Sequence, residues 1–209
     1  MNLKNILIAV GSIIATFVLL FIIYKFTNAP VRTEFPEINV VKTQDHKKWN
    51  TKSKNILVEY SDFECPACAS FHNFLKEMDK TATPNAQLVF RHFPLYQVHP
   101  VSFNAAYAAE AASIQGKFWE MSDLIFDNQA EWNKFTQPES YFINLAKKLS
   151  LDLNKFKIDM TSQAVKDRVQ TDLSEGEKIG INSTPSLFLN GKKVEVNNNE
   201  KLKKLLFSL

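Results

Sequence analysis

A run of about 19 residues without a charged side chain, residues 6–24, lies near the start of the chain between Lys4 and Lys25. A helix needs roughly 20 apolar residues to cross a bilayer. A helix buried in a soluble domain would show a polar face, which this run lacks. The run therefore predicts a membrane-spanning helix.

A cleavable signal peptide is the alternative interpretation of this segment. The apolar region of a signal peptide usually spans about 7–15 residues, which is shorter than this run. Residues 27–29 form only a poor cleavage site, and Pro30 follows directly. We therefore expect a retained anchor over residues 1–25. Lys4 precedes the run and Lys25 and Arg32 follow it, so the positive-inside rule does not decide its orientation.

Residues 26–50 read as a linker that leads into a domain over residues 51–209. Pro30, Pro36 and the polar residues 44–50 interrupt any long pattern, although residues 37–43 could form a short first strand.

The chain carries 25 basic and 22 acidic side chains, which are interleaved along it. Nucleic acid binding is not expected, because the basic residues form no stripe that could follow a phosphate backbone.

The periodicity of the domain predicts a small α/β sheet with a helical insertion. Short apolar runs predict strands at 55–61 and 86–93, and helical spacing predicts a helix from Cys65 onward. Residues 99–180 are helical in texture, with Asp152 and Ser162 as helix caps. Asn190-Gly191 predicts a hairpin between strands 186–189 and 193–196, because both positions tolerate a positive φ. A terminal helix follows over residues 202–209.

The chain has two cysteines, Cys65 and Cys68, and they lie where a strand gives way to a helix. A disulfide exchange enzyme needs an exposed thiolate of low pKa and a second thiol close enough to resolve the mixed disulfide. A helix amino terminus stabilises a thiolate through its free N–H groups and partial positive charge. The pattern therefore predicts Cys65 as the reactive thiol and Cys68 as its partner.

Two other interpretations of the cysteines remain open. Cys65, Cys68 and His72 have tolerable spacing for zinc, but a structural zinc site usually has four ligands and a second cysteine pair is absent. The cysteines could instead be inert core residues, since free cysteine is often buried. Their place on either side of Pro66 at a helix start favours exposure over packing.

Four motifs together resemble the DsbA-like branch of the thioredoxin superfamily. They are Phe-Glu-Cys-Pro-Ala-Cys at residues 63–68, Arg-His-Phe-Pro-Leu at 91–95, Gln-Gly-Lys-Phe-Trp at 115–119, and Thr-Pro-Ser-Leu-Phe-Leu-Asn-Gly at 184–191. The resemblance covers residues 54–209. It implies a thioredoxin fold interrupted by a helical domain, which agrees with the predicted insertion at about 99–180.

The resemblance also implies roles for single residues. Cys65 is similar to the family's nucleophile and Cys68 to its buried resolving thiol. Pro185 matches the cis-proline beside the active site, with Thr184 before it. Glu59 matches a buried acid linked to proton transfer; by itself it is a charged residue in an apolar strand, which calls for a partner or a function. His72, His92 and His99 are expected to be structural.

One departure from the family pattern concerns the strength of the oxidant. The best-known members have a histidine between the cysteines, where this chain has Ala67. A histidine can stabilise the thiolate and alanine cannot. Asp62 and Glu64 add negative charge nearby, which opposes a thiolate.

The function that we expect is a dithiol oxidase that donates the Cys65–Cys68 disulfide to exported proteins. A DsbB-like partner is implied for reoxidation, with no organic cofactor or metal. The protein is expected to be single-pass in the bacterial cytoplasmic membrane, in contact with lipid through its first helix, with the catalytic domain on the extracytoplasmic side. A reductase or isomerase of the same fold, and a non-catalytic module that binds unfolded chains, are the alternatives.

Overall fold

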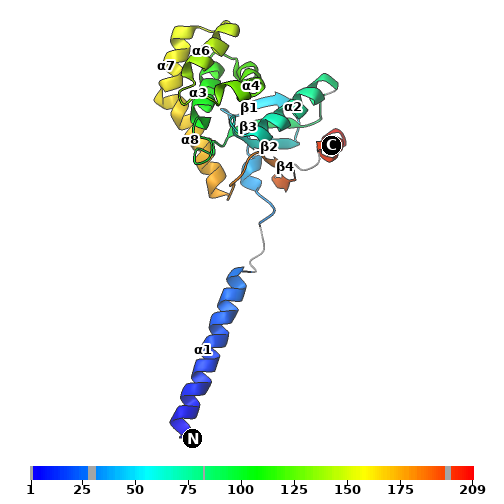
Figure 1. Ribbon diagram of the computed structural model, residues 1–209. Coiled ribbons are helices and arrows are strands. Elements are labelled where there is room, and N and C mark those ends of the chain that lie inside the picture. Colours follow the sequence, from blue (N-terminus) through cyan, green and yellow to red (C-terminus); the bar gives the residue numbers. More distant parts are fainter. Residues whose placement is uncertain (1, 28–31, 82, 196–198) are drawn as a thin grey trace. The chain divides into compact units, whose positions relative to one another are not determined.

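The computed structural model describes residues 2–27, 32–81, 83–195 and 199–209 (Figure 1). The predicted weak cleavage site falls partly outside these residues, as do Pro30 and the end of the predicted strand at 193–196. Contacts divide the chain into two units, Met1–Thr33 and Glu34–Leu209, and each is described by itself.

The first unit contains helix α1, Leu3–Thr27. Its segment Leu3–Lys25 has a mean hydropathy of 3.0 and is long and apolar enough to cross a membrane. A signal sequence near an amino terminus would satisfy the same length and composition. Its few polar groups are satisfied locally, because the Ser12 and Thr16 hydroxyls each donate to the carbonyl four residues earlier.

The second unit is built on a five-stranded sheet with the order β1-β3-β2-β4-β5. Its strands are β1 (His46–Trp49), β2 (Ile56–Ser61), β3 (Gln87–His92), β4 (Ser186–Leu189) and β5 (Lys192–Val194). Strands β2 and β3 are parallel and joined by helix α2 (Pro66–Thr81), whereas the other neighbouring pairs are antiparallel. This arrangement places β2, which leads to the cysteines, at the centre of the sheet.

A block of helices is inserted between β3 and β4 and gathers beside the sheet (Figure 1). It comprises α3 (Ser102–Ser113), α4 (Phe118–Asp127), α5 (Gln129–Trp132), α6 (Glu139–Lys148), α7 (Leu153–Thr161) and α8 (Gln163–Lys178). The short η1 (Pro36–Asn39) precedes the sheet, and α9 (Asn199–Phe207) follows it. The predicted thioredoxin-type α/β fold with a helical insertion is therefore confirmed.

The two faces of the sheet are covered by different elements, because side chains alternate along each strand. Leu57 and Leu88 pack with α2 and α9 in one cluster. Val58 and Val89 face the other way, toward residues of η1 and α8. Glu59 is on the same face of β2 as Leu57, two residues further along, so it points toward the side that α2 covers.

The start of the domain differs from the prediction. A strand over residues 37–43 is wrong, because Pro36 opens the 3₁₀ helix η1 there and Ile38 is buried. The first strand instead lies at His46–Trp49, inside the predicted linker, and pairs with β3. Its polar sequence suits the edge of a sheet, where lysine is common.

Local signals predicted the remaining elements well. Asp152 and Ser162 cap α7 and α8 by accepting the N–H of Lys155 and Val165. Asn190 and Gly191 both have positive φ, 51° and 77°, as the hairpin requires. The short helix α5 was not predicted.

Candidate functional site

Cys65 lies immediately before helix α2, and Cys68 lies in its first turn. Pro66 is the first residue of this helix, a position that suits proline because its missing N–H would have no partner there. The chain turns after Ser61, the last residue of β2, and the Cys65 N–H donates to the Asp62 carbonyl over 3.1 Å. Cys65 is 7% exposed and Cys68 is fully buried, and both are free thiols. Both belong to a hydrophobic cluster, so the expectation that the helix start favours exposure over packing is wrong.

The pKa of Cys65 is lowered, whereas the pKa of Cys68 is raised. A hydrogen bond from the Cys68 thiol lowers the pKa of Cys65 to about 5 against the opposing effect of burial, with further help from Thr184 and from the backbone N–H groups of Cys68 and Ala67. Burial raises the pKa of Cys68 well above its ordinary value, and the charge on Cys65 adds to this. The chain can therefore hold one thiolate, at the more exposed sulfur.

The loop before β4 lies against the first cysteine. The Thr184–Pro185 bond is cis, as the resemblance implied. The Cys65 thiol donates to the Thr184 carbonyl oxygen over 3.4 Å. The Thr184 hydroxyl oxygen is buried and meets no hydrogen-bond partner within the described part of the chain, so a Cys65 thiolate would supply its missing acceptor.

A buried acid lies on β2, the strand that leads to the cysteines. Glu59 is 3% exposed, and burial raises its pKa to about 7, with Ser61 acting in the other direction. Ser61 also lowers the pKa of Cys68. Ser61 thus affects the pKa of both groups, although its hydroxyl oxygen forms no hydrogen bond within the described part of the chain. Ser61 was not predicted as a site residue, although it lies two positions after Glu59, on the same face of the strand.

The acids next to the cysteines hold the active-site turn in place. Asp62 accepts hydrogen bonds from the Leu95 N–H over 2.8 Å and from His99 Nδ1 over 2.6 Å. Glu64 accepts from the Val101 N–H over 2.9 Å, and burial raises its pKa. These carboxylates bind the turn to the segment that leads into α3, a role that their sequence positions alone did not indicate.

Gln129 supports the same turn from helix α5. Its side-chain amide donates to the carbonyl of Phe63 over 2.8 Å and to that of Cys65 over 3.0 Å. The residue is buried, and it lies more than 60 positions along the chain from the groups that it contacts. No local pattern marks it, because its role arises only from the packing of the insertion against the turn.

His72 does not join the cysteines in a metal site. Its Nε2 lies 2.9 Å from Asp123, and its ring stacks on Phe126. Among the described residues, the group of side chains that could hold a metal contains neither cysteine and lies elsewhere. The zinc interpretation of the cysteine motif therefore finds no support in the geometry.

A family model described as Thioredoxin matches residues 43–207. The chain belongs to the thioredoxin family. The match begins before the first strand and ends in α9, so it includes the helical insertion.

Solved structures share this fold at low sequence identity. The thiol-disulfide exchange protein alpha-DsbA2 from Wolbachia pipientis superposes with a TM-score of 0.69 at 17% identity, over 82% of this chain and 90% of that one. A thioredoxin-like oxidoreductase from Silicibacter pomeroyi gives a TM-score of 0.65 at 24% identity, over 78% and 90%.

Curated relatives align with only part of their own length. The Na(+)/H(+) antiporter NhaA 1 of Mycolicibacterium vanbaalenii is 38% identical over 152 residues, which are 71% of this chain and 24% of that protein. The chain thus spans about a quarter of the length of the curated relatives that it matches.

Proposed function

We propose that this thioredoxin-family protein is a thiol–disulfide oxidoreductase, and that it acts as a dithiol oxidase on exported proteins. The observation that carries this proposal is the asymmetry of the cysteine pair. Cys65 has a pKa of about 5 and is the more exposed sulfur, whereas Cys68 is fully buried with a raised pKa. Thiol–disulfide exchange needs this division between an attackable sulfur and a buried resolving thiol.

The reaction begins with the pair oxidised. A substrate thiolate attacks Cys65 Sγ, the Cys65–Cys68 bond breaks, and its electron pair leaves on Cys68. A second substrate thiolate then attacks the substrate sulfur of the mixed disulfide, and Cys65 leaves as a thiolate. The substrate loses two electrons and two protons, and the cysteine pair gains the two electrons. A disulfide or quinone oxidant, carried by a DsbB-like partner, must restore the pair, and no bound cofactor is needed.

We propose that the proton that neutralises the Cys68 thiolate comes from a buried side chain of the protein. Cys68 leaves as a thiolate at a site that disfavours its charge, so it must be protonated quickly. Glu59, with a pKa of about 7, is half-protonated near neutral pH. The Ser61 hydroxyl affects the pKa of both groups and forms no hydrogen bond within the described part of the chain, so we propose that it turns to pass the proton between them. Glu59 and Ser61 are thus assigned to proton transfer.

The acidity of Cys65 supports the proposed oxidase direction. A thiolate with a pKa of about 5 stabilises the reduced form about 100-fold at pH 7 relative to an ordinary thiol. Since tenfold corresponds to roughly 30 mV for a two-electron couple, the pair becomes more oxidising by about 60 mV. This supports an oxidase rather than a reductase, whose pair would be more reducing. The Thr184–Pro185 loop lies where substrate would approach Cys65.

We further propose that α1 anchors the protein in the bacterial cytoplasmic membrane, with the domain on the extracytoplasmic side. The support is the length and hydropathy of Leu3–Lys25 and the oxidising chemistry assigned to the domain. Carbonate washing of membranes should not release the protein, and protease added to spheroplasts should digest the domain. A soluble form that begins near Pro30 would show cleavage and refute the anchor.

Replacing the resolving thiol tests the exchange reaction. Cys68→Ala should accumulate mixed disulfides with exported proteins, visible on non-reducing gels and removed by reductant. The matched control is the double variant Cys65→Ala/Cys68→Ala, which should form none. A folded, exported Cys68→Ala protein without adducts would favour the binding-module alternative. The reduction potential of the wild-type pair separates the enzyme classes, because a value near that of thioredoxin, about −270 mV, would indicate a reductase.

A further inference from the structure

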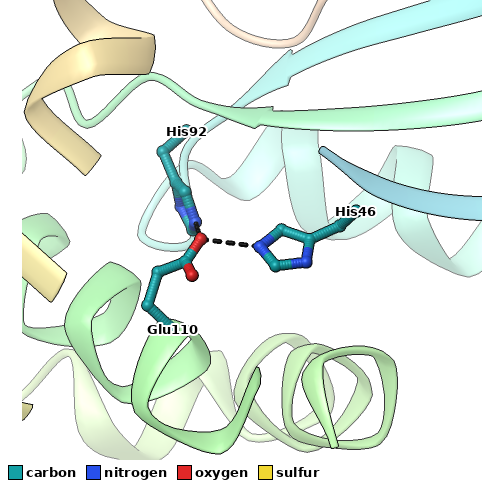
Figure 2. Close-up of side chains that lie close together, drawn as sticks. All are labelled: His46, His92 and Glu110. Carbon is teal, nitrogen blue, oxygen red and sulfur yellow. Dashed lines mark hydrogen bonds and ion pairs between the residues drawn. The ribbon is translucent and has the colours of Figure 1, made fainter. Parts of the chain in front are cut away.

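A second group of reactive side chains lies apart from the cysteine pair, where the sheet meets the helical insertion. It consists of His46 on β1, His92 on β3 and Glu110 on α3. Figure 2 shows both imidazole rings directed at one carboxylate oxygen. The Nε2 atoms of His46 and His92 lie 2.6 and 2.7 Å from Glu110 Oε1. All three ligand atoms fall within 4.8 Å of one another.

We propose that these three residues form a zinc-binding site. Two imidazole nitrogens and one carboxylate oxygen make a donor set that zinc uses with water as a fourth ligand. Zinc–ligand distances of about 2.0–2.2 Å are reached by small movements, in which the ion replaces the two hydrogen bonds to Glu110. Calcium and magnesium are excluded by the donors, because both ions prefer oxygen ligands. The proposal departs from the expectation that the protein needs no metal.

The surrounding charges favour a cation. The carboxylates of Asp45, Glu110 and Asp172 gather here with the guanidinium groups of Arg91 and Arg168. When both imidazoles are neutral, the three carboxylates and the two guanidinium groups together carry a net charge of −1. Arg168 lies 3.9 Å from Glu110 but 2.5 Å from Asp172, so its charge is largely compensated elsewhere. A buried excess charge is costly, and Zn²⁺ with one hydroxide ligand would neutralise it, whereas Zn²⁺ with a neutral water would leave one positive charge.

Aromatic rings fix the directions of both imidazoles. The His46 ring stacks parallel to Phe118, with an interplanar angle of 7°. The His92 ring lies edge-on to Phe118 and to Phe90, with centroids 5.9 and 5.2 Å away. Held in this way, the nitrogen atoms stay directed at Glu110 without an ion. A ligand set fixed in advance loses little conformational freedom when it binds.

A cavity lies beside His46, at one end of the site. A cavity of about 680 Å³ is lined by His46 together with Asp45, Phe118 and Trp119. Of the three proposed ligands only His46 lines this cavity, and His92 and Glu110 are buried, so the ion would enter past the His46 ring. The ion would join two strands of the sheet to the first helix of the insertion. Zinc would therefore stabilise the junction between the two parts of the fold.

Metal titration of the full chain in detergent micelles tests the proposal. The Cys65–Cys68 pair is kept oxidised so that thiolates cannot bind the ion. Zinc chloride, in competition with a chelator dye, should show one ion per chain and raise the melting temperature. His46→Gln and Glu110→Gln should each weaken binding at least tenfold. The matched control is His72→Gln, which removes another buried imidazole paired with an acid and should leave the affinity unchanged.

Cobalt provides a measurement that needs no variant. Co²⁺ bound to the oxidised wild-type chain should give visible d–d bands of nitrogen and oxygen coordination, and zinc should abolish them. The absence of stoichiometric zinc binding would overturn the proposal. The three side chains would then only form hydrogen bonds with one another. Equal affinity for Ca²⁺, or unchanged zinc affinity in both His46→Gln and Glu110→Gln, would overturn it as well.

Discussion

The sulfur of Cys65 lies 3.4 Å from the carbonyl oxygen of Thr184, although 119 positions separate the two residues in the chain. The contact joins the start of α2 to the loop before β4, so the reactive sulfur is held against main chain from a distant segment. An extended substrate that approaches Cys65 meets this loop and can form backbone hydrogen bonds there, as an added strand does. The Thr184 side chain also lowers the pKa of Cys65, after the larger effect of Cys68.

Titration of the reduced protein should reveal one acidic thiol. Thiolate absorbance near 240 nm should rise with a midpoint near pH 5, assigned to Cys65. In Cys68→Ala the midpoint should move upward, because the hydrogen bond from the Cys68 thiol is the largest cause of the low pKa. In Cys65→Ser the step should disappear. A step that survives in Cys65→Ser but not in Cys68→Ala would reverse the assignment of the two thiols.

The stability of the reduced protein should depend on the same ionisation. The folded pKa of Cys65 lies below that of the unfolded chain, so its stabilising effect is fully present above the unfolded pKa, near 8.5, and is lost as pH falls through 5. At pH 7 the effect amounts to about 2–3 kcal/mol. In urea unfolding, the stability advantage of the reduced wild type over reduced Cys65→Ser should be larger at pH 7 than at pH 4 by this amount. A constant difference across this range would contradict the ionisation.

Local sequence signals were sufficient for the elements around the cysteines. The apolar run of β2, Pro66 at the first helical position and Asn190-Gly191 in the hairpin each fix their conformation with near neighbours alone. Strand β1 was missed because its sequence is polar, and its strand conformation comes from pairing with β3. Its His46 is half-buried through contacts with α3 and α4, which no local pattern encodes.

The same distinction holds within the candidate site. Glu59 stood out because a charged residue in an apolar strand needs an explanation, and the structure places it in the interior. Ser61 and Gln129 gave no comparable signal, because serine and glutamine are ordinary residues in most contexts. The negative charges of Asp62 and Glu64 were recognised, but their partners lie in the segment before α3, more than 30 positions away.

Replacing Glu59 by glutamine should stabilise the protein in a pH-dependent way. The folded pKa of about 7 exceeds the ordinary value of 4.5, so the wild type loses stability as pH rises from about 4.5 through 7. The glutamine side chain of the variant would stay neutral throughout. The variant's advantage in unfolding free energy should therefore grow from near zero at pH 4 to about 3 kcal/mol at pH 8. Denaturant unfolding at pH 4, 6 and 8 measures it, and an equal difference at all three values would refute the raised pKa.

Gly176 on α8 should not tolerate a side chain, because the helix approaches the sheet most closely there. A Cβ atom at this position would lie 2.6 and 2.7 Å from two ring carbons of Phe93 and 3.2 Å from the ring of Tyr60. Both rings are buried in the core on that face of the sheet and have little room to move.

Alanine adds up to about 1 kcal/mol of helix propensity. The overpacking should exceed this gain, since it typically costs about 1–3 kcal/mol. Gly176→Ala should therefore lower the melting temperature, whereas Thr171→Ala, on the exposed side of the same helix, should leave it unchanged or raise it slightly. Because α8 leads into the loop that holds Thr184, the displaced helix should also weaken the effect of the Thr184 side chain on Cys65 and raise the pKa of Cys65. A Gly176→Ala protein as stable as the wild type would show that Phe93 and Tyr60 can rearrange.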